Sequence, residues 1–168
     1  LSLGDIVSSR SIRMAGDKLN NDIAAYIKDK HGLIIGEHTA ENIKMKIGTA
    51  LKVDKPAEMD VRGRDVASGM PKQITVNENE IEEAIHDTLE QILTATVNVL
   101  ETVPPELASD IIDRGIMLTG GTALLKGIDK LFSDRLKVPV VVSQSPLDNV
   151  AKGAGEMLER MQKTDRKK

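Results

Sequence analysis

Cysteine and tryptophan are absent from this chain of 168 residues, and its only aromatic side chains are those of Tyr26 and Phe132. The lack of cysteine excludes disulfide bonds, thiol catalysis and cysteine metal sites. The shortage of aromatic rings removes the stacking platforms on which single-stranded nucleic acid is held. No apolar run approaches the roughly 20 residues that cross a bilayer. We therefore expect an aliphatic core.

The chain also lacks an excess of charge of one sign, because 23 basic residues oppose 26 acidic ones for a net charge of −3. This balance gives no electrostatic footprint for DNA, RNA or anionic lipid, so we expect no nucleic-acid partner. An apolar content of 40% and a charged content of 29% are typical of a globular domain. The composition favours a cytoplasmic protein. The sequence opens at Leu1 in what reads as mid-strand, so we expect a fragment.

The most informative stretch is Arg114–Gly127, which reads R-G-I-M-L-T-G-G-T-A-L-L-K-G. Its short apolar burst, Ile116–Leu118, predicts a buried strand that ends in a turn at Gly120-Gly121 and continues into a helix. Paired glycines let a ligand approach the backbone, and a helix N-terminus offers unpaired N–H groups. Nucleotides are held in this way in α/β proteins, although the pattern also fits a plain turn from strand to helix.

The residues before 33 predict a hairpin and a helix. Gly4-Asp5 between two extended segments is typical of a hairpin within Leu1–Arg13. Apolar residues at helical spacing follow Gly16, and Gly32 stands where a left-handed C-cap belongs. We expect an amphipathic helix between these two glycines.

Residues 33–76 read as a small α+β subdomain. Thr39 is suited to cap a helix, on which Glu41 and Lys44 are surface neighbours, and their spacing alone fits a solvated pair. Two short alternating runs then predict a pair of strands, Met59–Arg62 and Gln73–Val76.

The remaining chain alternates helices and strands. Asn77 and Glu80 form a capping-box pattern that opens the longest helix, and Pro104-Pro105 ends it. Val138–Val142 predicts a second buried strand, and Pro146 stands at the first position of a last helix. The order of elements is that of an α/β protein.

Several stretches also carry a family pattern along the whole chain. They are Ser11–Asp17, Ile35–Lys44, Val61–Asp65, Pro104–Ala108, Asp113–Gly121 and Pro146–Gly155. Together they resemble the C-terminal half of the bacterial actin homologues of the MreB and Mbl type, which belong to the actin, Hsp70 and sugar-kinase ATPase superfamily. The resemblance implies an RNase H-like actin-fold subdomain, IIA, formed by residues 1–30 and 79–168. It implies an inserted small α+β subdomain, IIB, at residues 31–78.

The resemblance also implies a function for the longer protein. Such a protein binds ATP with magnesium and polymerises beneath the cell membrane into filaments that guide cell-wall synthesis and set rod shape. Its implied partners are further copies of itself and cell-wall elongation and morphogenesis proteins. The phosphate loops, the metal-associated aspartate, the water-positioning glutamate and the membrane contact belong to the absent N-terminal half. No catalytic or metal-binding residue is therefore expected here, and a fragment alone is expected to be inactive. The alternative is an Hsp70-like chaperone or a small-molecule kinase of the same superfamily.

Carried over by the resemblance, the nucleotide-binding residues are Gly16, Glu41, Lys44, Gly120, Gly121 and Thr122. The resemblance places the turn Gly120–Thr122 against the sugar and phosphate side of the nucleotide. It places Glu41 and Lys44, on the helix of the small subdomain, beside adenine and ribose, and Gly16 on the other wall of the nucleotide cleft. Thr122 departs from the third glycine that is usual in the family. Because a β-branched residue disfavours positive φ, the turn must be regular at Thr122 or the exchange costs about 1 kcal/mol or more.

Overall fold

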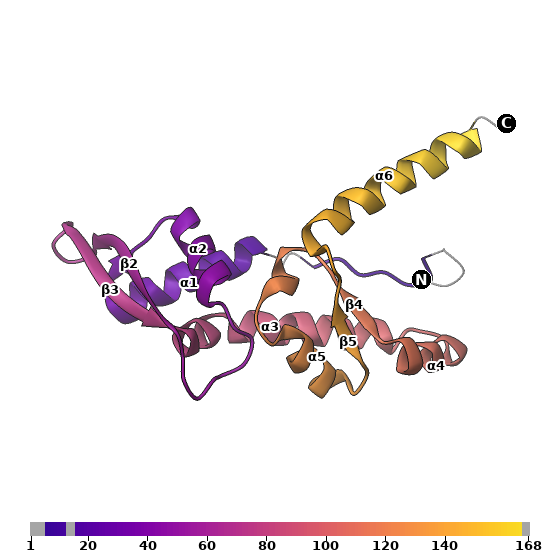
Figure 1. The fold of residues 1–168 in the computed structure, drawn as a ribbon, viewed down its shortest axis with the longest axis horizontal. Coiled ribbons are helices and arrows are strands. Elements are labelled where there is room, and N and C mark those ends of the chain that lie inside the picture. Colours follow the sequence, from indigo (N-terminus) through magenta and orange to yellow (C-terminus); the bar gives the residue numbers. More distant parts are fainter. Residues whose placement is uncertain (1–5, 13–15, 166–168) are drawn as a thin grey trace.

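The structure, a computed structural model, describes residues 6–12 and 16–165 (Figure 1). Helices and strands alternate along most of the chain, which confirms a mixed α/β fold. The elements are α1 (Gly16–His31), β1 (Leu33–Ile34), α2 (Glu37–Ile47), β2 (Glu58–Asp65), β3 (Pro71–Asn77), α3 (Glu78–Leu100), α4 (Pro105–Arg114), β4 (Ile116–Leu118), the 3-10 helix η1 (Gly121–Leu124), α5 (Ile128–Leu136), β5 (Val140–Val142) and α6 (Pro146–Asp165).

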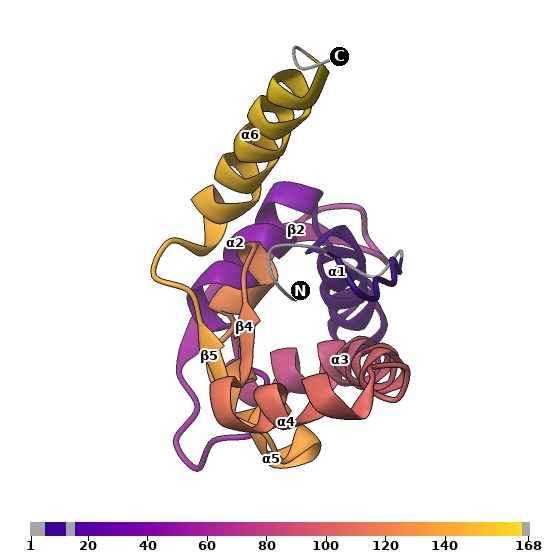
Figure 2. The same cartoon turned by 90° about the vertical axis from the view of Figure 1, so that its right-hand side faces the viewer.

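The strands form two separate sheets. One is antiparallel in the order β1-β2-β3, and the other is the parallel pair β4-β5. The long helix α3 runs from the first sheet towards the second, where α4 and α5 lie beside β4 and β5 (Figure 1). Figure 2 shows α1 and α3 on one side and β4 and β5 on the other, while α6 projects away from the rest.

The core is aliphatic, as the composition predicts. Phe132 is buried within it, whereas Tyr26 lies only partly buried at its edge and donates a hydrogen bond of 2.9 Å to Glu83. The fully buried apolar side chains of the two long packed helices are Leu19, Ile23 and Ile27 of α1 and Ile81, Ile85 and Leu89 of α3. One continuous cluster joins both sheets to these helices.

Local signals located most helix ends correctly. Gly32 has φ 63° and follows α1, and its N–H donates to the Lys28 carbonyl over 3.0 Å. Asn77 and Glu80 form the expected capping box at the start of α3. The prediction for Thr39 was wrong, because α2 begins at Glu37 with Gly36 as its N-cap.

The strand predictions were confirmed in part. β2 and β3 are the two expected strands and extend further than their alternating runs, and they pair antiparallel with Val61 opposite Ile74. The described part of the predicted N-terminal hairpin, residues 6–12, forms no strand, and its Gly4-Asp5 turn lies outside the described residues. Burial was wrong for β4, since Met117 is 67% exposed. Its register partner Val141 is exposed as well, so this face of the two-stranded sheet is open in the described part of the chain.

The capping box yields a stability prediction. Asn77→Ala removes the acceptor for the N–H groups of Asn79 and Glu80, at 3.0 and 3.2 Å. We expect a loss of about 1 kcal/mol, and for a chain of this size a melting temperature lower by roughly 2 to 4 °C. Urea denaturation of the chain measures the free energy directly. The control is Asn42→Ala, which alters an exposed side chain within α2, and equal effects of the two changes would contradict a role for the cap.

Candidate functional site

One pocket, of about 460 Å³, contains every residue that the resemblance assigns to the nucleotide. Its walls come from the start of α1, the outer face of α2, the turn between β4 and η1, and the start of α6. The lining residues are Gly16, Asp17, Asn20, Glu41, Lys44, Met45, Thr119, Gly120, Gly121, Thr122 and Leu147. Its volume lies within the range of roughly 300 to 1,000 Å³ that is usual for small-molecule sites.

The glycine turn is held by the first residue of α6. The Gly120 N–H and the Thr119 hydroxyl both donate to the Pro146 carbonyl, at 2.8 and 3.0 Å. Gly120 has φ 85°, and a β-carbon built there meets no atom within 4 Å. Gly121 has no such backbone demand, and its β-carbon would lie 3.7 Å from Leu147 Cδ2. The conformation of the turn therefore depends on Gly120, while Gly121 leaves space beside the pocket.

Thr122 is accommodated without backbone strain. Among the described residues, Lys137 is the only non-glycine with positive φ, so the turn is regular at Thr122. The helix expected after the glycines is a 3-10 helix of 4 residues, in which the Leu125 N–H donates to the Thr122 carbonyl over 3.2 Å. Such a short helix provides little macrodipole, so the argument from an α-helix N-terminus was wrong.

Lys44 is not the solvated residue that its spacing from Glu41 suggested. The residue is only 9% exposed, and its ammonium donates a hydrogen bond of 3.2 Å to the Gly16 carbonyl. Burial lowers the pKa of Lys44, while the charges of Glu41 and Asp17 partly oppose this shift. Glu41 itself is exposed. A cation is thus fixed between the start of α1 and the pocket, with donors beyond the one that Gly16 uses.

Sequence reasoning missed Asn20 as a lining residue. The residue is 5% exposed, and its Oδ1 has no hydrogen-bond partner within the described structure. A signal was available, because Gly16 and Asn20 are four residues apart on one helix and therefore share a face. Asp17, Met45, Thr119 and Leu147 were missed as well.

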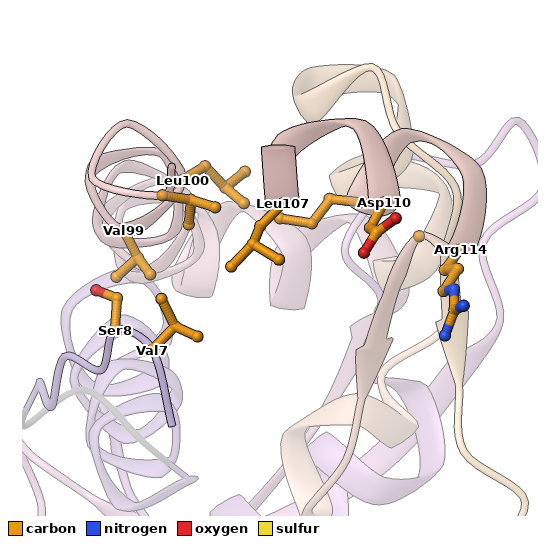
Figure 3. Close-up of a pocket in the computed structure, with 10 residues that line it drawn as sticks. Val7, Ser8, Val99, Leu100, Leu107, Asp110 and Arg114 are labelled. Carbon is orange, nitrogen blue, oxygen red and sulfur yellow. The ribbon is translucent and has the colours of Figure 1, made fainter. Parts of the chain in front are cut away.

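A second hollow, of about 430 Å³, lies between Val7 and Ser8, the end of α3, and α4 (Figure 3). Leu100 and Leu107 give it an apolar lining, and Asp110 and Arg114 add charge at the α4 side. It contains none of the residues that were predicted to bind nucleotide.

Two further kinds of feature are absent from the described residues. None of the helices in residues 16–165 is both long enough and apolar enough to span a membrane. No group of three or more His, Asp or Glu side chains in this part of the chain is arranged to hold a metal ion.

Comparison with known proteins gives consistent matches. The family model described as MreB/Mbl protein matches residues 1–166. Cell shape-determining protein Mbl of Bacillus subtilis is 51% identical over 168 residues, which are 100% of this chain and 50% of that protein. Cell shape-determining protein MreB of Escherichia coli K12 is 46% identical over 159 residues, which are 95% of this chain and 46% of that protein. The chain thus spans about half the length of these curated relatives.

Solved structures agree with the sequence matches. The crystal structure of MreB 5 of Spiroplasma citri bound to AMPPNP is 36% identical, with a TM-score of 0.89 over 98% of this chain and 49% of that one. A double helical filament of MamK shares the fold at 18% identity, with a TM-score of 0.73 over 88% of this chain and 45% of that one. On the family model, the identities and the shared fold, the chain belongs to the MreB/Mbl family.

Proposed function

We propose that the chain is the C-terminal half of an ATP-binding, actin-like cytoskeletal protein. The observation that carries this proposal is the pocket, which is lined by all six residues that the family resemblance assigns to the nucleotide. The fact that the chain spans about half of its relatives supports a longer protein, called the full-length protein below. In it, residues 1–30 and 79–168 would form the RNase H-like subdomain IIA, and residues 31–78 the inserted subdomain IIB.

The lining supports adenosine as the part of the ligand that this half holds. Gly120 and Gly121 leave open space beside the backbone of the turn, which suits a sugar or a phosphate at close range. Lys44 and Glu41 place a donor and an acceptor on the opposite wall, where ribose hydroxyls and the adenine edge have matching groups. The MreB 5 structures of Spiroplasma citri are bound to AMPPNP and to ADP, which agrees with this ligand class.

The groups that hold magnesium, position the attacking water and contact the membrane would belong to the other half. Filaments of the full-length protein beneath the membrane would guide cell-wall synthesis and recruit elongation and morphogenesis proteins. The names of the relatives, cell shape-determining proteins, support this role. A MamK filament with the same fold supports self-assembly.

Gly121→Val tests the ligand space in the full-length protein. A β-carbon at this position would make an ordinary contact with Leu147 at 3.7 Å, and the backbone of Gly121 has no positive φ that a side chain would strain. A ligand at a hundredfold excess over its Kd stabilises the folded state by about 2.7 kcal/mol. We expect that increment to disappear in the variant, as measured by the ATP-induced shift in melting temperature. Gly36→Val is the control, since Gly36 has extended backbone and open surroundings. A full ATP shift in Gly121→Val would overturn the adenosine site.

Lys44→Met separates the binding role from the structural one. Because burial lowers the pKa of Lys44, its charged form is disfavoured in the folded state. We expect the variant without nucleotide to be at least as stable as the wild type, yet to lose much of the ATP-induced shift. Lys46→Met, on the exposed side of the same helix, should change neither. A variant that keeps the whole ATP shift would remove Lys44 from the site.

The pH dependence provides a second measurement on Lys44. Below its lowered folded-state pKa, the full cost of burying the ammonium is present. As the pH rises from that value towards the ordinary 10.5, the folded state releases the proton first and the cost is relieved. The wild type should therefore gain stability relative to Lys44→Met over this range. Urea denaturation at several pH values measures the difference, and a flat difference would contradict the burial argument.

The β2–β3 hairpin is our proposed longitudinal filament contact. The Arg62 guanidinium donates a hydrogen bond of 2.8 Å to the Gln73 side-chain oxygen. In the turn that follows Asp65, the Ser68 N–H and hydroxyl both donate to the Asp65 carboxylate over 2.9 Å, so the hairpin presents a defined surface. Val66 and Met70 are exposed at its tip. Side chains of this kind, exposed and apolar within a polar rim, are typical of interaction sites.

Arg64→Glu in the full-length protein tests the filament contact. The side chain is exposed on β2, so the change should leave folding intact while reversing a charge in the contact. We expect a higher critical concentration for ATP-dependent pelleting. The charge reversal Lys28→Glu on the exposed surface of α1 serves as control. If both variants pellet like the wild type, the hairpin tip is not the contact.

A further inference from the structure

The two main walls of the pocket meet at one short pairing of backbone. On one wall, α2 ends at Ile47 and the chain continues through Gly48–Ala50. On the other wall, η1 ends at Leu124 and the chain continues through Leu125–Gly127. The Lys126 N–H donates to the Gly48 carbonyl over 3.3 Å, and the Ala50 N–H donates to the Lys126 carbonyl over 2.8 Å. These bonds form a parallel bridge between Thr49 and Lys126. We call this pairing, together with Glu78, the wall joint.

Close packing at the wall joint depends on Gly48. A β-carbon there would lie 2.7 Å from Leu125 Cδ2 and 2.2 Å from the Lys44 carbonyl oxygen. Its φ of −68° is ordinary, so the requirement for glycine comes from space and not from backbone conformation. Leu125 is buried in the core and has little room to withdraw. Glycine at this position therefore permits two close approaches, that of the chain to the Lys44 carbonyl at the end of α2 and that of α2 to Leu125 in the segment after η1.

An ion pair ties the wall joint to a third segment. The Glu78 carboxylate is paired with the Lys126 ammonium, and it also accepts the Ala57 N–H over 2.9 Å. Glu78 is only 5% exposed, whereas Lys126 reaches it from the surface. The hydrogen bond from Ala57 and the charge of Lys126 both lower the pKa of Glu78, so the carboxylate is charged at neutral pH. A buried charge with fixed partners holds its neighbours in one geometry.

We propose that the wall joint sets the separation between α2 and the glycine turn, with Gly48, Glu78 and Lys126 as positioning residues for the nucleotide. None of the three lines the pocket. A displacement at the joint passes to Lys44 because one turn of α2 links Lys44 to Gly48. It passes to Thr122 because Thr122 belongs to η1, which continues directly into Leu125 of the joint. The identity of the ligand as a nucleotide rests on the proposed function, whereas the effect of the wall joint on the distance between α2 and the glycine turn does not.

The geometric effect is measured on the 168-residue chain without nucleotide. The chain has no native cysteine, so Lys46→Cys on α2 and Lys130→Cys on α5 give a single nitroxide pair. Both positions are exposed. We expect Gly48→Ala to lengthen or broaden the inter-spin distance distribution. Gly36→Ala at the other end of α2, where a β-carbon meets nothing within 4 Å, should leave the distribution unchanged. An unchanged distribution in Gly48→Ala would overturn the proposal.

A second variant keeps the test decisive if Gly48→Ala fails to fold, as judged by circular dichroism. Lys126→Met removes the ammonium from a largely exposed side chain and leaves Glu78 bound to Ala57. The distance distribution should broaden, and Lys126→Arg should restore it. Lys30→Met breaks the ion pair of a similarly exposed lysine, with Glu83 at 3.7 Å, which joins α1 to α3 and involves neither labelled helix, so it should have no effect. Equal behaviour of the Lys126 and Lys30 variants would reject the joint.

ATP affinity of the full-length protein distinguishes the two proposals. If the joint positions the nucleotide, Lys126→Met weakens ATP binding severalfold and Lys126→Arg recovers it, while the Lys30→Met control matches the wild type. If the wild type binds no ATP but the distances still change, the joint stands and the proposed function is wrong. If ATP binds with equal affinity to all variants and the distances are constant, the proposed function stands and the joint is wrong.

Discussion

The packing of α1 against α3 is the interaction on which the rest of the structure depends. Leu19, Ile23 and Ile27 are fully buried where α1 packs into the core, and each such side chain stabilises the fold by roughly 1.5 to 3 kcal/mol. Because α1 is fixed along its length, its first residue, Gly16, is held at the pocket and accepts the Lys44 ammonium. Because α3 runs past both sheets, the same packing keeps the β1-β2-β3 sheet and the β4-β5 pair in one body.

The pocket forms largely where helices and strands begin or end, and this location determines which chemical groups it offers. A strand ends before Gly120, a helix begins at Pro146, and the two ends are hydrogen-bonded to each other. The ends of helices and strands leave backbone N–H and C=O groups without partners inside the element, so these groups can bind a ligand. Lys44 adds a side-chain group, because it reaches the pocket from the last turn of α2 and is partly desolvated there. The site therefore combines backbone polarity with a single buried cation.

Features that depend on near neighbours in the chain were predictable from the sequence. The capping box at Asn77, the left-handed Gly32 and the β2–β3 pair all follow from short-range rules, and all are present. The burial of Lys44 and the exposure of Met117 depend on which distant segments pack nearby, so periodicity predicted both wrongly. The prediction that six residues share one site came from the family resemblance. Spacing in the sequence could not predict that Gly16 and Gly120, which lie on opposite walls, line the same pocket.

The open face of the β4-β5 sheet bears on how this chain can be handled in solution. Parallel sheets are normally covered on both faces, and β4 has only β5 as a partner in the described part of the chain. Met117 and Val141 lie opposite each other in the register of these two short strands, and both side chains are exposed, so they form an apolar strip on one face. Concentrated samples of the isolated chain therefore face a tendency to associate through this face. Low protein concentration, or coexpression with a segment that covers β4, is the physically reasonable way to keep it monomeric.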